Sequence, residues 1–161
     1  MTRYTHSPIL RATMAKNFGI GNKAPVFTLK DQNGQIISLE EALSTGPVAL
    51  FFYPGDQTPG CTIQLCAIRD DWNDFIKAGI HVYGINPADA KSHTAFIKKH
   101  DFPFPLLIDE NRKVTKAYDA EQDLFITKIV KRTVVGIAKD GHIIYYRQGM
   151  PKNTEIIKAF K

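Results

Sequence analysis

Several features that would assign the chain to a specialised class are missing from the sequence. No apolar run approaches the roughly 18 residues that a membrane-spanning helix needs, and the stretch Val48 to Tyr53 is far too short. Only two cysteines occur in 161 residues, too few for the disulfide framework of a small secreted domain. Internal repeats, linkers and low-complexity tracts are also missing. We therefore expect one soluble globular domain, not held in a membrane, whose cysteines either carry chemistry or have no special role.

Acidic residues are missing from the first 30 positions, which contain Arg3, Arg11, Lys16, Lys23 and Lys30. The rest of the chain holds 16 basic and 16 acidic side chains, so the net charge of +5 comes from this N-terminal part. Because the remainder is balanced and shows no interleaving of basic and aromatic residues, a nucleic-acid partner is not expected. The basic start lacks the apolar centre of a secretory signal. We expect an ordinary extension and a cytoplasmic protein, with an organelle as the alternative if the leader is a cleaved transit peptide.

Strand and helix patterns alternate along the chain. Val26 to Leu29 and Gln35 to Ser38 flank Asn33-Gly34, which predicts an N-terminal β-hairpin with this dipeptide as its turn. The run Val48 to Tyr53 predicts a central strand buried on both faces. The later predicted elements are a helix from Cys61 to Gly79, a strand at Ile80 to Ile85, a helix started by Asn86-Pro87, a short extended stretch at Pro105 to Ile108, a helix around Arg112 to Tyr118, a hairpin of Thr133 to Ala138 and His142 to Arg147, and a helix capped by Asn153 that ends at Phe160. This order predicts an α/β domain with parallel strands in its sheet.

A loop rich in proline and glycine, Pro54 to Cys61, joins the central strand to the next helix. It brings Cys61 to a helix N-terminus, where free N–H groups and the helix dipole favour the thiolate, the nucleophilic form of cysteine. Thr58 lies three residues earlier and could hydrogen-bond to the thiol region or to a bound oxygen. The alternative is that Cys61 is only a small buried hydrophobic residue. Its place after a buried strand, where open α/β sheets bind ligands, favours a function.

The second cysteine, Cys66, lies five positions after Cys61. An ideal helix separates two such Cα atoms by roughly 8.6 Å, whereas a disulfide tolerates about 7 Å at most. A disulfide between them therefore requires local unwinding at the start of the helix, after oxidation of Cys61 to a sulfenic acid. The alternative is that Cys66 has no redox role. A zinc site is disfavoured because the histidines, His6, His81, His93, His100 and His142, are scattered.

These residues together resemble the peroxiredoxins. Pro54, Thr58 and Cys61 form the Pro-x-x-x-Thr-x-x-Cys signature of that superfamily. The second cysteine five positions on resembles the subgroup called bacterioferritin comigratory protein or peroxiredoxin Q. The resemblance covers roughly residues 18 to 160, so we expect residues 1–17 to be an N-terminal extension and residues 18–161 to be the domain.

The resemblance implies a thioredoxin-like fold, with a central mixed sheet flanked by helices and an N-terminal β-hairpin. It implies an enzyme, a thioredoxin-dependent peroxidase of the atypical 2-Cys type, in which Cys61 attacks the peroxide and Cys66 resolves the sulfenic acid as a disulfide. In this family Thr58 and Pro54 would orient and shield the peroxide, and Arg132 would support the thiolate. The substrates would be hydrogen peroxide and organic hydroperoxides, and the reductant thioredoxin or a similar dithiol protein. No metal or organic cofactor is implied, and a monomer or weak dimer is expected.

Two segments depart from the family pattern, and two other functions remain possible from sequence. An aromatic residue usually follows the arginine, but here Thr133 to Ala138 includes Gly136, which weakens a strand or marks a close approach. Gly84 to Pro87 replaces small polar residues.

A thiol-disulfide exchange protein normally has C-x-x-C and an X-Pro bond facing it, and Lys131-Arg132-Thr133 stands where that proline would be. A redox-responsive binding protein, whose helix unwinds on oxidation to signal to a partner, stays open.

Overall fold

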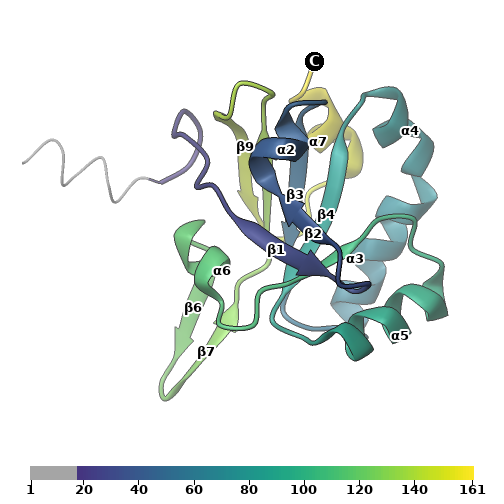
Figure 1. The fold of residues 1–161 in the computed structure, drawn as a ribbon, viewed down its shortest axis with the longest axis vertical. Helices are drawn as coiled ribbons and strands as arrows, with labels where there is room; N and C mark the ends of the chain where they lie inside the picture. The colour runs from purple at the N-terminus through teal and green to yellow at the C-terminus, as the bar shows by residue number, and fades with distance from the viewer. Residues whose placement is uncertain (1–17) are drawn as a thin grey trace, which may run out of the picture.

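The computed structural model describes residues 18–161, and the predicted extension at residues 1–17 lies outside this range. Phe18, the first described residue, packs edge-on against Tyr118 and Tyr146. The elements in chain order (Figure 1) are β1 (Thr28–Asp31), β2 (Ile36–Ser38), α2 (Leu39–Leu43), β3 (Val48–Phe52), α3 (Pro59–Asp70), α4 (Trp72–Lys77), β4 (His81–Asn86), α5 (Ala90–His100), β5 (Leu106–Ile108), α6 (Lys113–Ala117), β6 (Glu121–Leu124), β7 (Thr127–Val130), β8 (Thr133–Ile137), β9 (Ile143–Gln148) and α7 (Asn153–Lys158).

Seven of the strands form one mixed sheet in the order β2-β1-β5-β4-β3-β8-β9. The pairs β3–β4 and β4–β5 are parallel, and the remaining pairs of this sheet are antiparallel. Side chains from α3, α4, α5 and α7 pack in one core cluster, and those from α2 and α6 pack in a second cluster. Helices therefore cover both faces of the mixed sheet, as the family resemblance implies.

Strand β3 separates the two core clusters, and every residue in it is buried. Ala49 and Phe51 point into the cluster with α3, whereas Val48, Leu50 and Phe52 point into the cluster with α2. Because successive side chains of a strand face opposite sides, a run with both sides covered must be apolar throughout. The predicted doubly buried strand is confirmed, and its end fixes the position of the loop that carries Cys61.

The prediction of one continuous helix from Cys61 to Gly79 is wrong. The helix breaks at Asp71, whose φ of −97° and ψ of 17° end α3 and start α4. The carboxylate of Asp71 accepts a hydrogen bond from Asn153 Nδ2 at 2.9 Å, which ties the break to the start of α7. A contact from a residue so distant in the sequence leaves no mark on local helical periodicity.

The predicted helix start at Asn86-Pro87 is also wrong. Asn86 is the buried last residue of β4, and its Oδ1 accepts from the backbone N–H of Ala88 at 2.8 Å. The cap of α5 is instead Asp89, whose side chain accepts from Ser92 N. At the C-terminal helix the N-cap is Lys152, so Asn153 is the first residue of α7 and does not cap it.

Both predicted hairpins are present in the fold. The predicted N-terminal β1–β2 hairpin is present, but its loop is longer than Asn33-Gly34, because the backbone of Asp31 bonds to Gln35 and its side chain also accepts from both Asn33 N and Gln35 N. The predicted β8–β9 hairpin is present too. Helix α2 and the separate two-stranded sheet β6–β7 were not predicted. The β6–β7 hairpin projects from the body in Figure 1.

Within residues 18–161 no helix has both the length and the apolar character needed to cross a membrane.

Candidate active site

Cys61 lies in the first turn of α3, immediately beyond the loop that follows β3. Thr58 is the N-cap of this helix, Pro59 occupies its first position, and the carbonyl of Thr58 accepts from Thr62 N at 2.9 Å. Proline suits this position because its missing N–H would have no partner inside the helix. The side chain of Cys61 is fully buried, with 0% of its surface exposed. The thiol therefore sits where backbone N–H groups and the helix dipole favour an anion.

Arg132 reaches this sulfur from a distant part of the sequence. Strand β8 runs antiparallel to β3, with Thr133 opposite Phe52, so the residue before Thr133 lies next to the end of β3. The Nη2 of Arg132 donates to Cys61 Sγ at 3.5 Å. The structure thus brings together two predicted site residues that lie 71 positions apart in the sequence. A guanidinium at this distance stabilises a negatively charged sulfur.

Two residues that sequence reasoning missed, Gln64 and Gly60, hold this guanidinium in place. The buried Gln64 lies one helical turn after Cys61, and its Oε1 accepts from Arg132 Nη1 at 2.8 Å. A Cβ atom on Gly60 would lie only 3.0 Å from Arg132 Nη2, so the absence of a side chain there makes room for the arginine. The i, i+3 spacing of Gln64 from Cys61 placed it on the same helix face, which was the available signal.

Thr58 and Pro54, the other predicted site residues, do not contact the sulfur through any hydrogen bond in residues 18–161. Both are exposed, and the hydroxyl of Thr58 donates to the carbonyl of Gly55 at 3.1 Å. The side chain of Thr58 makes no capping bond to α3. Their roles toward a peroxide stay predictions.

Cys66 lies on the same helix as Cys61, and both cysteines are free thiols. It is partly buried and packs against the core cluster that contains Cys61. Helix α3 is continuous from Pro59 to Asp70, so the ideal-helix separation of roughly 8.6 Å between the two Cα atoms applies. A direct bond between these sulfurs requires the first turns of α3 to open.

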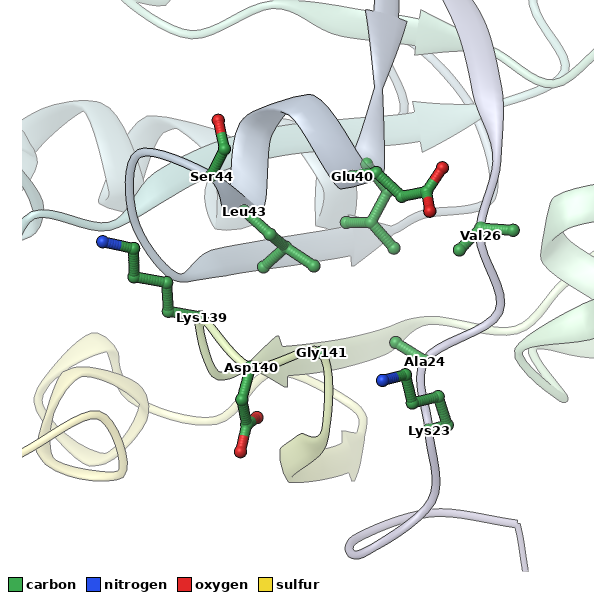
Figure 2. Close-up of a pocket in the computed structure, with 10 residues that line it drawn as sticks. Lys23, Ala24, Val26, Glu40, Leu43, Ser44, Lys139, Asp140 and Gly141 are labelled. Carbon is green, nitrogen blue, oxygen red and sulfur yellow. The ribbon is translucent and has the colours of Figure 1, made fainter.

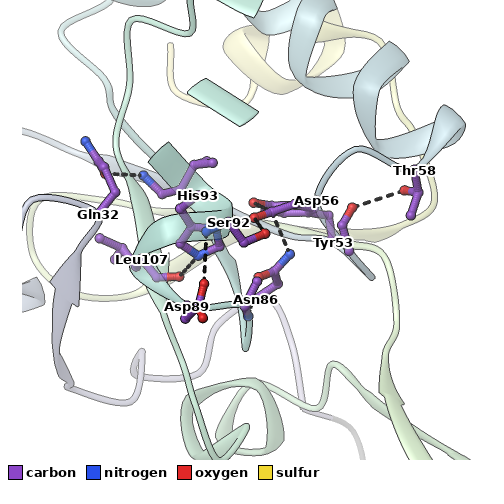
Figure 3. A network of polar contacts seen from close by, with 12 residues as sticks. Gln32, Tyr53, Asp56, Thr58, Asn86, Asp89, Ser92, His93 and Leu107 are labelled. Carbon is purple, nitrogen blue, oxygen red and sulfur yellow. Dashed lines mark hydrogen bonds and ion pairs between the residues drawn. The ribbon is translucent and has the colours of Figure 1, made fainter. Parts of the chain in front are cut away.

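A buried polar network fixes the loop in front of Cys61 (Figure 3). Its centre is Asp56, whose carboxylate contacts Tyr53, Asn86, Ser92 and His93. Burial alone would raise the pKa of Asp56, but the hydrogen bond and charge of His93 outweigh it, helped by Tyr53 and Ser92, so this pKa lies below its ordinary value. Burial and the neighbouring Asp56 carboxylate raise the pKa of Tyr53 well above its ordinary value.

No local pattern in the sequence indicates this network. His93 was grouped with the scattered histidines, and Asp56 was one polar residue among several in a loop. Their meeting depends on how α5 packs across the end of β3 and β4, which no local pattern reports.

The pocket in Figure 2 lies away from these groups. It has a volume of about 260 Å³ and is lined by residues before and within α2 and in the β8–β9 turn, among them Lys23, Leu43, Lys139 and Asp140. These residues adjoin the start of β3, whereas Cys61 follows its end. Within residues 18–161 there is no group of three or more His, Cys, Asp or Glu side chains placed to hold a metal ion.

Comparison with known proteins shows the family and the fold of the chain. Residues 20–146 match the AhpC/TSA family, and the chain belongs to that family. Peroxiredoxin Q from the chloroplast of Triticum aestivum is 47% identical over 134 residues, which are 82% of this chain and 61% of that protein. The corresponding Arabidopsis thaliana protein is 46% identical over 145 residues, which are 88% of this chain and 66% of that protein. The chain spans less than two thirds of the length of these relatives. Their sequence identity confirms the predicted resemblance to peroxiredoxin Q.

Solved structures extend the comparison to three dimensions. Peroxidoxin BcpB from Mycobacterium tuberculosis has a TM-score of 0.81 at 30% identity, over 89% of this chain and 94% of that one. Peroxiredoxin Q from Xanthomonas campestris has a TM-score of 0.75 at 24% identity, over 83% of this chain and 89% of that one, and supports the fold alone. The predicted thioredoxin-like fold is confirmed.

Proposed function

We propose that the chain is a thiol-dependent peroxidase that reduces hydrogen peroxide and organic hydroperoxides. The observation that carries this proposal is the Arg132 guanidinium 3.5 Å from the sulfur of Cys61, in the first turn of α3. Helix N-terminus and guanidinium both favour the thiolate, and the guanidinium can also donate to peroxide oxygens as negative charge moves onto them. Membership of the AhpC/TSA family and the peroxiredoxin Q relatives support the same assignment.

The first step is a two-electron oxidation of Cys61. Its thiolate attacks one oxygen of ROOH, the O–O bond breaks, and the leaving alkoxide takes a proton to become ROH. The sulfur is oxidised to a sulfenic acid and the peroxide is reduced. Thr58 and Pro54 belong to the segment that joins β3 to α3, and we assign them the orientation and shielding of the peroxide. The hydroxyl oxygen of Thr58, which donates to Gly55, keeps lone pairs that can accept from a peroxide O–H.

The second step requires the start of α3 to open, because Cys61 and Cys66 lie on one continuous helix. The thiol of Cys66 then attacks the sulfenic acid, an S–S bond forms, and water leaves. A dithiol protein such as thioredoxin reduces this disulfide by exchange and becomes oxidised itself. We propose no metal or organic cofactor. The Cys61 sulfur gives two electrons to the peroxide, and the dithiol protein returns two electrons when it reduces the disulfide.

The proposal also covers the oligomeric state of the protein and its cellular compartment. We infer a monomer or weak dimer in the cytoplasm, although the relatives named above are chloroplastic proteins. Size-exclusion chromatography with light scattering and imaging of the tagged chain test these two points.

A coupled assay tests the activity. Wild-type protein, thioredoxin, thioredoxin reductase and NADPH are mixed with hydrogen peroxide or with a bulky organic hydroperoxide, and NADPH oxidation is followed. We expect turnover that Cys61→Ser abolishes and that Cys66→Ser limits to one oxidation event with thioredoxin. Normal turnover by Cys61→Ser would refute the assignment. Oxidation without turnover would favour a redox-responsive binding protein, and exchange with protein disulfides without peroxide reduction would favour a thiol-disulfide exchange protein.

A further inference from the structure

Asp56 is held at one point by side chains from three other parts of the fold (Figure 3). Its Oδ1 accepts from the hydroxyl of Tyr53 at 2.6 Å and from Asn86 Nδ2 at 3.1 Å. Its Oδ2 meets Ser92 Oγ at 2.7 Å and His93 Nδ1 at 2.7 Å. Only 3% of the Asp56 side chain is exposed. A carboxylate with four such partners is a strong anchor, because each bond to a buried charge is stronger than a neutral one.

Both ring nitrogens of His93 face hydrogen-bond acceptors when Asp56 is ionised. His93 is fully buried, and its Nε2 faces the carbonyl of Leu107 at 3.0 Å, which can only accept a hydrogen bond. Nitrogen Nδ1 faces the Asp56 carboxylate, which is also an acceptor. The orientation of the Asn86 amide is fixed, because its Oδ1 accepts a hydrogen bond from Ala88 N. Its Nδ2 therefore donates to Asp56. The lowered pKa of Asp56 favours its carboxylate form. With that carboxylate, an imidazolium that donates at both nitrogens satisfies every group, and the two residues form a buried ion pair.

This ion pair lies just before the segment that must move. Asp56 precedes the N-cap Thr58 by two residues and Cys61 by five. The start of α3 itself is weakly held, because Thr58 gives no side-chain cap and Pro59 has no N–H. Upstream, the loop is fixed to β4 and α5 through Asp56. Downstream, the first turn is fixed through the contact between Cys61 and Arg132.

We propose that Asp56 and His93 are positioning residues that set the balance between the helical form, in which Cys61 meets Arg132, and the opened form, in which Cys66 reaches Cys61. The pair favours the helical form by tying the loop to α5, and a weaker pair shifts the population toward the opened form. Disulfide formation is faster when more of the protein is open, whereas attack on peroxide is slower because fewer molecules hold the thiolate beside the arginine. The inference rests on the proposed peroxidase function for its consequence, but the opening itself is measurable without peroxide.

The test compares Asp56→Asn, Ser92→Ala and Asp89→Ala with wild type. Asp56→Asn removes the charge and turns one acceptor into a donor, and Ser92→Ala removes one of four partners without touching the ion pair. Asp89→Ala is the control for loss of the α5 cap, because Asp89 is exposed and bonds to the backbone N–H of Ser92 and not to Asp56. Two readouts use the reduced protein: amide hydrogen exchange of residues 58–66, and the rate at which diamide, a two-electron thiol oxidant, produces the Cys61–Cys66 disulfide. A third is the rate of peroxide attack in stopped flow.

Asp56→Asn is expected to accelerate both exchange at residues 58–66 and disulfide formation about tenfold, the effect of losing one charge-assisted hydrogen bond. It is expected to slow peroxide attack, and Ser92→Ala changes all three in the same directions by less. Should Asp56→Asn fail to fold, Ser92→Ala decides. Local exchange and disulfide rates that stay at wild-type values, or that rise equally in Asp89→Ala, overturn the inference. Failure of wild type to consume peroxide, with exchange and diamide rates responding as stated, refutes the proposed function and leaves the anchor supported.

Discussion

The Nη2 atom of Arg132 lies 3.5 Å from the sulfur of Cys61, while Nη1 of the same guanidinium binds Gln64 at 2.8 Å. One planar group therefore contacts the nucleophile and the helix that carries it. Because both contacts use the fixed fork of the guanidinium, a shift of either partner changes the other. The arginine is thus both an electrostatic partner of the sulfur and a brace on the first turns of α3.

Arg132→Ala is expected to reduce the rate of peroxide attack by about 10²-fold, the cost of removing one donor that stabilises developing charge. Arg132→Lys keeps the positive charge but loses the second N–H group that binds Gln64. Its rate of peroxide attack should therefore lie between those of wild type and Arg132→Ala. Stopped-flow mixing with hydrogen peroxide measures the rate, and absorbance of the thiolate near 240 nm reports how much of Cys61 is ionised. An unchanged rate in Arg132→Ala would show that the guanidinium takes no part in the attack.

Gly60→Ala is expected to slow the reaction without destabilising the fold. The added Cβ would lie 3.0 Å from Arg132 Nη2 and push the guanidinium off the sulfur. Alanine is otherwise better than glycine inside a helix by about 1 kcal/mol, so thermal stability should hold or rise. The matched control is the same substitution in the Arg132→Ala background, where the new methyl meets no guanidinium and should slow nothing further. A slowing of equal size in both backgrounds would argue against this contact.

The sequence predicted elements whose signal is local. The apolar run at Val48–Phe52 marked β3, because a strand covered on both faces has no polar positions. The runs Thr133 to Ala138 and His142 to Arg147 indicated the β8–β9 hairpin, and the loop rich in proline and glycine indicated the turn that delivers Cys61 to α3. Cysteine placement could be predicted because a nucleophile at a helix start depends on neighbours in the sequence.

Features set by distant contacts escaped prediction. The break at Asp71 coincides with its bond to Asn153, and the tip of β6–β7 shows Phe125 and Ile126 fully exposed, against any apolar-inside pattern. Arg132 was predicted only through a family resemblance, since nothing in Lys131 to Thr133 itself indicates a partner at Cys61. The Asp56–His93 pair had no signal, because it joins a loop residue to a residue of α5 that is distant in the sequence.

Stability should depend on pH through Asp56. Its pKa in the folded protein lies below the ordinary value of 3.8, so the carboxylate stabilises the fold fully above that value. This contribution is lost as pH falls through the lowered pKa. The difference in the free energy of unfolding between wild type and Asp56→Asn should therefore be largest at neutral pH and shrink below pH 3.8. Urea denaturation across a pH series measures it, and a difference that stays constant into acid would contradict the assigned charge.

Gly136→Ala is expected to lower the free energy of unfolding by about 1–3 kcal/mol, the usual cost of overpacking a core. Gly136 lies in β8, where an added Cβ would come within 2.9 Å of Phe160 Cζ and 3.0 Å of Tyr145 Cβ. This is the close approach that the glycine in a strand pattern indicated. Replacing the aromatic ring by the smaller leucine side chain, in Phe160→Leu, removes one of the two clashing groups. The double variant should therefore recover part of the lost free energy of unfolding. Urea unfolding of the four proteins measures the coupling, and additive losses would show that Phe160 is not the group that Gly136 accommodates.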